Sequence, residues 1–133
     1  MASKNRLLSG IIDNEGEIKI ARLDAGFDNK TYSYTGTLEI NTGSRRLYMA
    51  QALTLNAVDG YVGTAPVGAA AIFTLKKNGS SIGTLTIADG ATTVTDTSFN
   101  ESFARGDYIT VDITQVGSGT AGADLYINFR FIG

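Results

Sequence analysis

The six carboxylates between residues 89 and 124 are the side chains best suited to chemistry: Asp89, Asp96, Glu101, Asp107, Asp112 and Asp124. Two carboxyl groups held about 5–9.5 Å apart across a cleft can hydrolyse a glycosidic bond. The positions of these six favour structural roles instead, since Asp89 lies in a turn and Asp112 on the polar face of an expected strand. We therefore expect no catalysis from them.

The residue types that are missing from the chain exclude several other catalytic mechanisms. The 133 residues include no His and no Cys, which excludes Ser-His-Asp and Cys-His nucleophiles, zinc fingers and disulfides. The densest group of oxygen ligands, residues 13–17, lacks the spacing of an EF-hand loop. We predict that the protein is not an enzyme and has no cofactor and no metal site.

The overall charge and hydropathy narrow the range of partners. The net charge is −2, and only 18% of the residues are charged, whereas a general nucleic-acid binder needs clustered Lys and Arg. No apolar run approaches the roughly 20 residues of a membrane span, and no signal-peptide core follows the N-terminus. We expect neither nucleic acid nor a membrane as a partner.

The elements that would position any site are strands. Apolar and polar residues alternate in Tyr108–Thr114 and in Leu125–Phe131, as in half-buried antiparallel strands. Residues 69–76 and 82–87 read as a hairpin whose turn is Asn78-Gly79. Weaker candidates are residues 32–40, 46–48, 52–58 and 92–95. About eight strands and no helix predict an all-β, antiparallel β-sandwich of jelly-roll or immunoglobulin-like type.

The first part of the chain differs in composition from the rest. Residues 1–30 hold ten of the 24 charged side chains, interrupted by short apolar clusters. We interpret residues 1–35 as an N-terminal arm or an extra hairpin, and residues 36–133 as the sandwich domain. Both readings of the first segment remain open at this stage.

An ordered series of short motifs from Leu47 to Gly133 resembles a β-sandwich module that recurs in virion proteins of tailed bacteriophages. The motifs are residues 63–69 (GTAPVGA), 77–79 (KNG), 87–90 (IADG), 105–113 (RGDYITVDI), 115–118 (QVGS) and 122–125 (GADL). Ala121 departs from the pattern, in which a proline precedes Gly122. The resemblance covers about two thirds of the chain. It implies a non-enzymatic part of a virion: a capsid decoration (cement) protein, or a domain of a head fibre, tail fibre or spike.

Within that setting the leading prediction is a capsid decoration protein, because the chain has no heptads, no collagen-like repeat and no long shaft. It would bind the outer surface of the shell of major capsid protein, after synthesis in the host cytoplasm, and we expect a homotrimer. The predicted contacts with the capsid or a neighbouring subunit are Leu7, Leu8, Ile11, Ile12, Ile18, Ile20, Arg45 and Arg46.

The alternative prediction is a receptor- or glycan-binding domain of a tail fibre or head fibre. It would use tyrosines, which stack on sugars as Trp does, although ordinary packing also accounts for tyrosines on strands. The candidates are Tyr32, Tyr34, Tyr61, Tyr108 and Tyr126.

Overall fold

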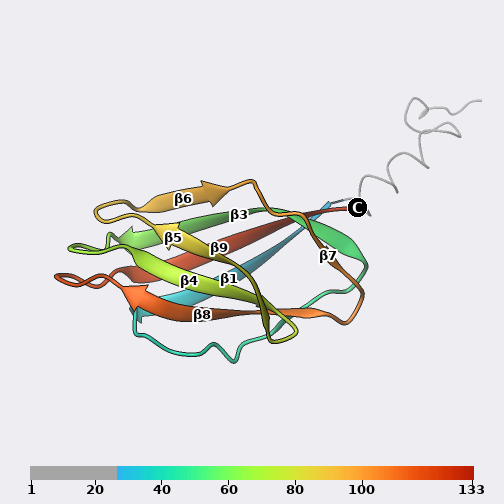
Figure 1. Ribbon diagram of the computed structural model, residues 1–133, viewed down its shortest axis with the longest axis horizontal. Coiled ribbons are helices and arrows are strands. Elements are labelled where there is room, and N and C mark those ends of the chain that lie inside the picture. Colours follow the sequence, from blue (N-terminus) through green and yellow to red (C-terminus); the bar gives the residue numbers. More distant parts are fainter. Residues whose placement is uncertain (1–26) are drawn as a thin grey trace, which may run out of the picture.

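The computed structural model describes residues 27–133, which form two antiparallel sheets packed face to face (Figure 1). The strands are β1 (Phe27–Thr37), β2 (Leu47–Tyr48), β3 (Leu53–Thr64), β4 (Ala71–Lys77), β5 (Ser80–Ile87), β6 (Thr93–Asp96), β7 (Glu101–Phe103), β8 (Tyr108–Val116) and β9 (Ala123–Ile132). The described residues contain no helix, and thus none that could span a membrane. The prediction of an all-β sandwich is confirmed.

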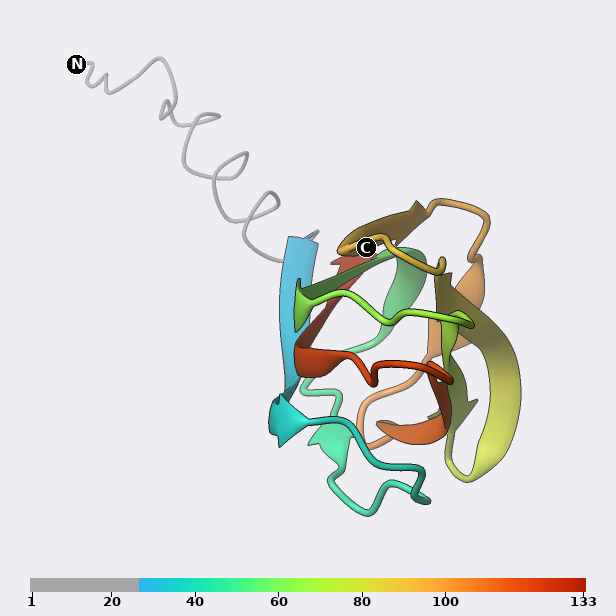
Figure 2. The ribbon, with the colours of Figure 1, turned by 90° about the vertical axis from the view of Figure 1, so that its left-hand side faces the viewer.

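The first sheet has the order β1-β9-β3-β6, and β7 pairs with the other half of β3. The second sheet has the order β2-β8-β4-β5. Figure 2, which looks along the strands, shows the two sheets as separate layers. The segment between β1 and β2 crosses from one layer to the other at one side of the sandwich.

The core lies between the layers and is built by the alternation seen in the sequence. The apolar residues of β8 and β9 that share a face are all buried: Ile109, Val111, Ile113, Leu125, Ile127, Phe129 and Phe131. They meet apolar side chains from β3, β4 and β5, with Phe73, Leu75, Leu85 and Ile87 among the most deeply buried. Burying an aliphatic or aromatic side chain of this size stabilises the fold by about 1.5–3 kcal/mol.

The structure differs from the sequence-based expectation in three places. β1 begins at Phe27 and pairs with β9 along its length, so the sandwich includes residues 27–35 rather than starting at residue 36. β3 continues past Val58 to Thr64, and the short strand β7 has no counterpart in the expected elements. Whether residues 1–26 form an arm concerns a segment outside the described residues.

The hairpin between β4 and β5 turns at the predicted pair. Asn78 and Gly79 have φ angles of 52° and 90°, the left-handed region that Asn and Gly tolerate best. The Asn78 side chain also ties this turn to the one before β8, because its Nδ2 donates to Asp107 Oδ1 and its Oδ1 accepts from the Tyr108 N–H, both at 3.0 Å. The bond from Asn78, with another from the Ala104 N–H, holds the pKa of Asp107 below its usual value.

Replacing this residue by alanine tests how much the turn contributes. We expect Asn78→Ala to lower the free energy of unfolding by about 2 kcal/mol, since alanine resists positive φ by about 1 kcal/mol and the bonds to Asp107 and Tyr108 are lost. Urea denaturation measures the change. Ser80→Ala, a neighbouring exposed position, is the control and should change stability by less than about 0.5 kcal/mol. Equal effects of the two substitutions would contradict this account of the turn.

Candidate functional site

The β1–β2 loop, residues 38–46, is held against the second sheet although it has no strand of its own. The backbone of Asn41 exchanges two hydrogen bonds with Ile113 of β8, at 3.0 and 2.9 Å. Gly43 lies so close to β8 that a Cβ atom there would be 1.9 Å from the Val111 carbonyl oxygen. The loop is therefore fixed along the edge of β8 that faces away from β4, at Asn41 and again at Gly43.

Asp112 is the side chain on β8 that secures the loop. It is only 8% exposed; its Oδ1 accepts the Gly43 N–H at 2.9 Å, and its Oδ2 lies 2.6 Å from the Lys76 ammonium on β4. Burial alone would raise the pKa of this carboxyl, but the bonds from Lys76 and Gly43 outweigh burial and hold the pKa below its usual value. The carboxylate is thus charged and fully engaged at neutral pH.

The loop separates two surface pockets. The first has a volume of about 420 Å³ and lies between the loop and β1; the second, of about 290 Å³, lies between the loop and the outer face of β8 and β4. Thr42, Gly43 and Ser44 line both pockets. The volume of the first pocket lies in the lower part of the range of small-ligand sites, about 300–1,000 Å³, and that of the second lies just below this range.

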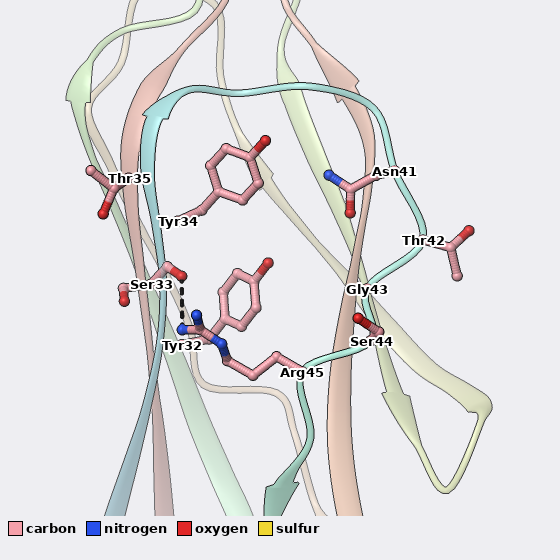
Figure 3. A pocket seen from close by; sticks show the side chains of 9 residues that line it. All are labelled: Tyr32, Ser33, Tyr34, Thr35, Asn41, Thr42, Gly43, Ser44 and Arg45. Atoms are coloured by element: carbon pink, nitrogen blue, oxygen red, sulfur yellow. Dashed lines mark hydrogen bonds between the residues drawn. The ribbon is translucent and has the colours of Figure 1, made fainter.

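Aromatic rings from β1 and a guanidinium from the loop line the first pocket (Figure 3). Tyr32 and Tyr34 project from β1 toward the loop, while Ser33 and Thr35 point the other way. The Arg45 guanidinium carbon lies 6.0 Å from the centre of the Tyr32 ring, and Arg45 Nη1 donates to the Ser33 carbonyl at 3.4 Å. Tyr32 is buried, which raises the pKa of its hydroxyl.

Arg46, the second arginine of the pair, lines the other pocket. The Arg46 guanidinium lies 4.2 Å from the centre of the Tyr108 ring, and its Nη1 donates to the Tyr48 hydroxyl at 3.0 Å. The bond to Tyr48 raises the pKa of Arg46. The two tyrosine rings are themselves 5.5 Å apart. Arg46 is exposed, so its guanidinium is positioned over the ring but remains accessible.

Arg45 and Arg46 differ from most cations of the described residues in having no carboxylate partner within that part of the chain. Ion pairs within 4 Å are formed by Lys30, Lys76, Lys77 and Arg130. Among residues 27–133 the cations outside these pairs are Arg45, Arg46 and Arg105. The loop therefore presents two neighbouring positive charges that an anionic partner could neutralise.

Each of the six carboxylates considered for catalysis accepts a hydrogen bond within the fold. Five of them accept a backbone N–H group of a turn or loop: Asp89 that of Gly68, Asp96 that of Ser98, Asp107 that of Ala104, Asp112 that of Gly43 and Asp124 that of Gly36. The sixth, Glu101, accepts from the Lys77 ammonium. These bonds give each carboxylate a structural role. Within the described residues, no three acidic side chains gather in a way that would hold a metal ion.

The structure describes two of the eight predicted contact residues. Arg45 and Arg46 lie in the loop, but their side chains diverge into different pockets. The predicted contacts at Leu7, Leu8, Ile11, Ile12, Ile18 and Ile20 lie outside the described residues. Sequence reasoning missed the polar lining supplied by Asn41, Thr42 and Ser44, for which the run of small polar residues before Arg45 was the available signal.

Comparisons with known proteins identify no family for the chain. No family model matches the sequence, and no curated protein matches it. Among solved structures, a CBM36 carbohydrate-binding module in complex with calcium and xylotriose shares 19% identity, with 78% of this chain and 87% of that chain covered and a TM-score of 0.43. A family 35 carbohydrate-binding module from Clostridium thermocellum shares 9% identity, with 79% and 90% covered and a TM-score of 0.44. A Bacillus endospore appendage protein shares 14%, with 80% and 86% covered and a TM-score of 0.41. These likenesses concern the β-sandwich fold alone.

Proposed function

We propose that the chain is a structural protein of a tailed-bacteriophage virion, a decoration protein that attaches to the outside of the capsid shell. The observation that carries the proposal is the fixed β1–β2 loop, which presents Arg45 and Arg46 without a carboxylate partner among residues 27–133. The motifs that resemble phage virion modules support the setting. The engagement of all six candidate carboxylates in structural bonds supports a binding role in place of catalysis.

Attachment would strengthen the shell by mass action. A ligand that binds only the assembled shell stabilises it by RT ln(1 + [L]/Kd), about 2.7 kcal/mol per site at a hundredfold excess over Kd. Many copies, each contacting more than one subunit of the major capsid protein, would oppose the pressure of packaged DNA. A homotrimer would match the three-fold positions of an icosahedral lattice.

Binding to purified, expanded, empty heads tests the proposal. We expect saturable binding of the wild-type protein, and Arg45→Ala/Arg46→Ala to weaken it about tenfold or more at low salt, because charge contacts at an interface are lost. The effect should shrink as salt rises. Arg105→Ala, which removes another arginine that forms no ion pair within the described residues but leaves the loop intact, is the matched control. Failure of the wild-type protein to bind heads, or equal binding by the double variant, would contradict the proposal.

A second candidate function is glycan binding by a receptor-binding domain of a tail fibre or head fibre. The specific observation in its favour is a pair of exposed tyrosines, Tyr61 and Tyr126, on the outer face of the first sheet. Binding of the purified protein to host cells, compared with its binding to heads, separates the two functions.

A further inference from the structure

The outer face of the first sheet carries an aromatic pair in register. Tyr61 on β3 lies directly opposite Tyr126 on β9, and the two side chains are 47% and 55% exposed. The same row continues to Ser33 on β1, opposite Tyr126, and to Thr93 on β6, opposite Tyr61. Four adjacent strands thus contribute one line of side chains: hydroxyl, ring, ring, hydroxyl.

The next row on this face is polar and electrically balanced. It consists of Thr31, Asn128, Asp59 and Thr95, which lie opposite one another across the same four strands. Asp59 forms an ion pair with Arg130 at 2.9 Å and accepts a hydrogen bond from the Thr95 hydroxyl at 2.9 Å. These contacts neutralise the carboxylate and fix its orientation, which leaves hydroxyl and amide groups beside the two rings.

On the other side of the aromatic row the surface is open. Two residues beyond Tyr61 on the same face of β3 is Gly63, which is exposed and has no side chain. Its strand neighbour is Asp124, whose Oδ1 is engaged by the Gly36 N–H at 2.8 Å. A ligand lying on the rings would therefore meet no bulky side chain at this position.

The chemistry of the face selects among possible ligands. Aromatic rings pack against the C–H faces of pyranose sugars, and neighbouring hydroxyl and amide groups bond to sugar hydroxyls. The two rows contain no aliphatic side chain for a typical protein interface core and no unpaired cation for nucleic-acid phosphates. Neighbouring strands lie about 4.8 Å apart, close to the length of one pyranose in an extended chain, so adjacent rings can address adjacent sugars.

We infer that this face, defined by Tyr61, Tyr126 and their flanking polar residues, binds a neutral polysaccharide chain that runs across the strands. The inference rests on the second candidate function, glycan binding, and locates it on the sheet opposite to the one that carries Tyr48. The loop that we propose for capsid attachment reaches this sheet only at its edge strand β1, where Arg45 Nη1 binds the Ser33 carbonyl, whereas the aromatic pair lies on β9 and β3.

Affinity electrophoresis of the full chain tests the inference, with hydroxyethylcellulose, galactomannan or dextran as the neutral polymer in the gel. The wild-type protein should be retarded in at least one of these gels. Tyr61→Ala/Tyr126→Ala should raise the apparent Kd tenfold or more, whereas Tyr61→Phe/Tyr126→Phe should retain most of the binding because the rings remain. Tyr48→Ala removes an equally exposed tyrosine (54%) from the other sheet and should leave retardation unchanged.

Two further measurements keep the result interpretable. Asn128→Ala removes an amide beside the rings without touching them and should weaken retardation severalfold. Sedimentation velocity reports whether the double alanine variant keeps its oligomeric state; a change of state without a change in retardation would mean that the face joins copies of this chain, and would overturn the inference. So would a wild-type protein that migrates freely in all three gels. Host-cell binding that survives the double alanine substitution would overturn the site and leave glycan binding as a function.

Discussion

Asp112→Ala should lower the free energy of unfolding by about 2–4 kcal/mol. The substitution leaves the Lys76 ammonium without its partner and the Gly43 N–H without its acceptor, and removing one member of a largely buried, hydrogen-bonded charge pair is among the costliest single changes. Urea denaturation at pH 7 measures the loss. Asp89→Ala, which removes an exposed carboxylate with one bond to the Gly68 N–H, should cost about 1 kcal/mol or less. Similar losses for the two variants would contradict the role assigned to Asp112.

The same carboxylate gives this prediction a pH dependence. Its pKa in the folded protein lies below the ordinary value of 3.8. The stability that the charged carboxylate contributes is therefore fully present above pH 3.8 and is lost as the pH falls through the folded pKa. The stability difference between the wild-type protein and Asp112→Asn should therefore shrink below about pH 4. The lowered pKa values of Asp96 and Asp107 act equally in both proteins and cancel. A difference that stays constant from pH 6 to pH 2 would contradict the linkage.

Gly43→Ala should detach the β1–β2 loop from β8. A Cβ atom at Gly43 would lie 1.9 Å from the Val111 carbonyl oxygen, and a backbone atom inside a sheet cannot move aside for it. We expect a loss of about 2–3 kcal/mol of stability, in the range of overpacked cores, and faster hydrogen exchange at the amides of Asn41 and Gly43. If the loop attaches the protein to a shell, head binding should fall with it.

A second glycine separates this clash from the general cost of replacing glycine. Gly90 has φ near +80° and open space around it, so Gly90→Ala introduces backbone strain of about 1 kcal/mol without a clash. Hydrogen exchange at Asn41 and Gly43 should be unchanged in this variant. Slow exchange at those amides in Gly43→Ala would show that the loop tolerates the side chain, and would contradict the packing argument.

The sequence predicted the strands best where apolar and polar residues alternate over a long, uninterrupted stretch. The strands β8 and β9 and the β4–β5 hairpin could be predicted because seven or more residues alternate or because Asn78-Gly79 marks the turn. The short strand β7 could not, since three residues with one buried side chain, Phe103, carry no period. Its pairing depends on β3, which is distant in the sequence.

The full length of β3 could not be predicted either, for a different reason. Asp59-Gly60 resembles a turn, yet both residues lie inside the strand. Asp59 is tolerated because Arg130 pairs with it from the next strand, and Gly60 is there because a Cβ would lie 2.9 Å from the Leu85 side chain of the opposite sheet. Both reasons are tertiary, so a local pattern cannot reveal them.

The candidate site was predictable only in part for the same reason. Arg45 and Arg46 could be identified as a basic pair, but their divergence toward Tyr32 and Tyr108 depends on a loop that crosses between sheets. Thr110 and Asp112 alternate as solvent-facing residues would, and the structure buries them beside that loop. The register of Tyr61 with Tyr126 likewise arises from pairing between strands about 65 residues apart.

One edge of the first sheet is divided between two short strands, and this affects how the protein associates with itself at high concentration. β6 and β7, of four and three residues, share the margin beside β3, and β2 at the margin of the other sheet has two residues. Interruptions of this kind deprive a neighbouring chain of a template for strand addition. Among the described strands, the long edges left for pairing with another molecule are those of β1 and β5, and charged or proline substitutions there would reduce such pairing at high concentration.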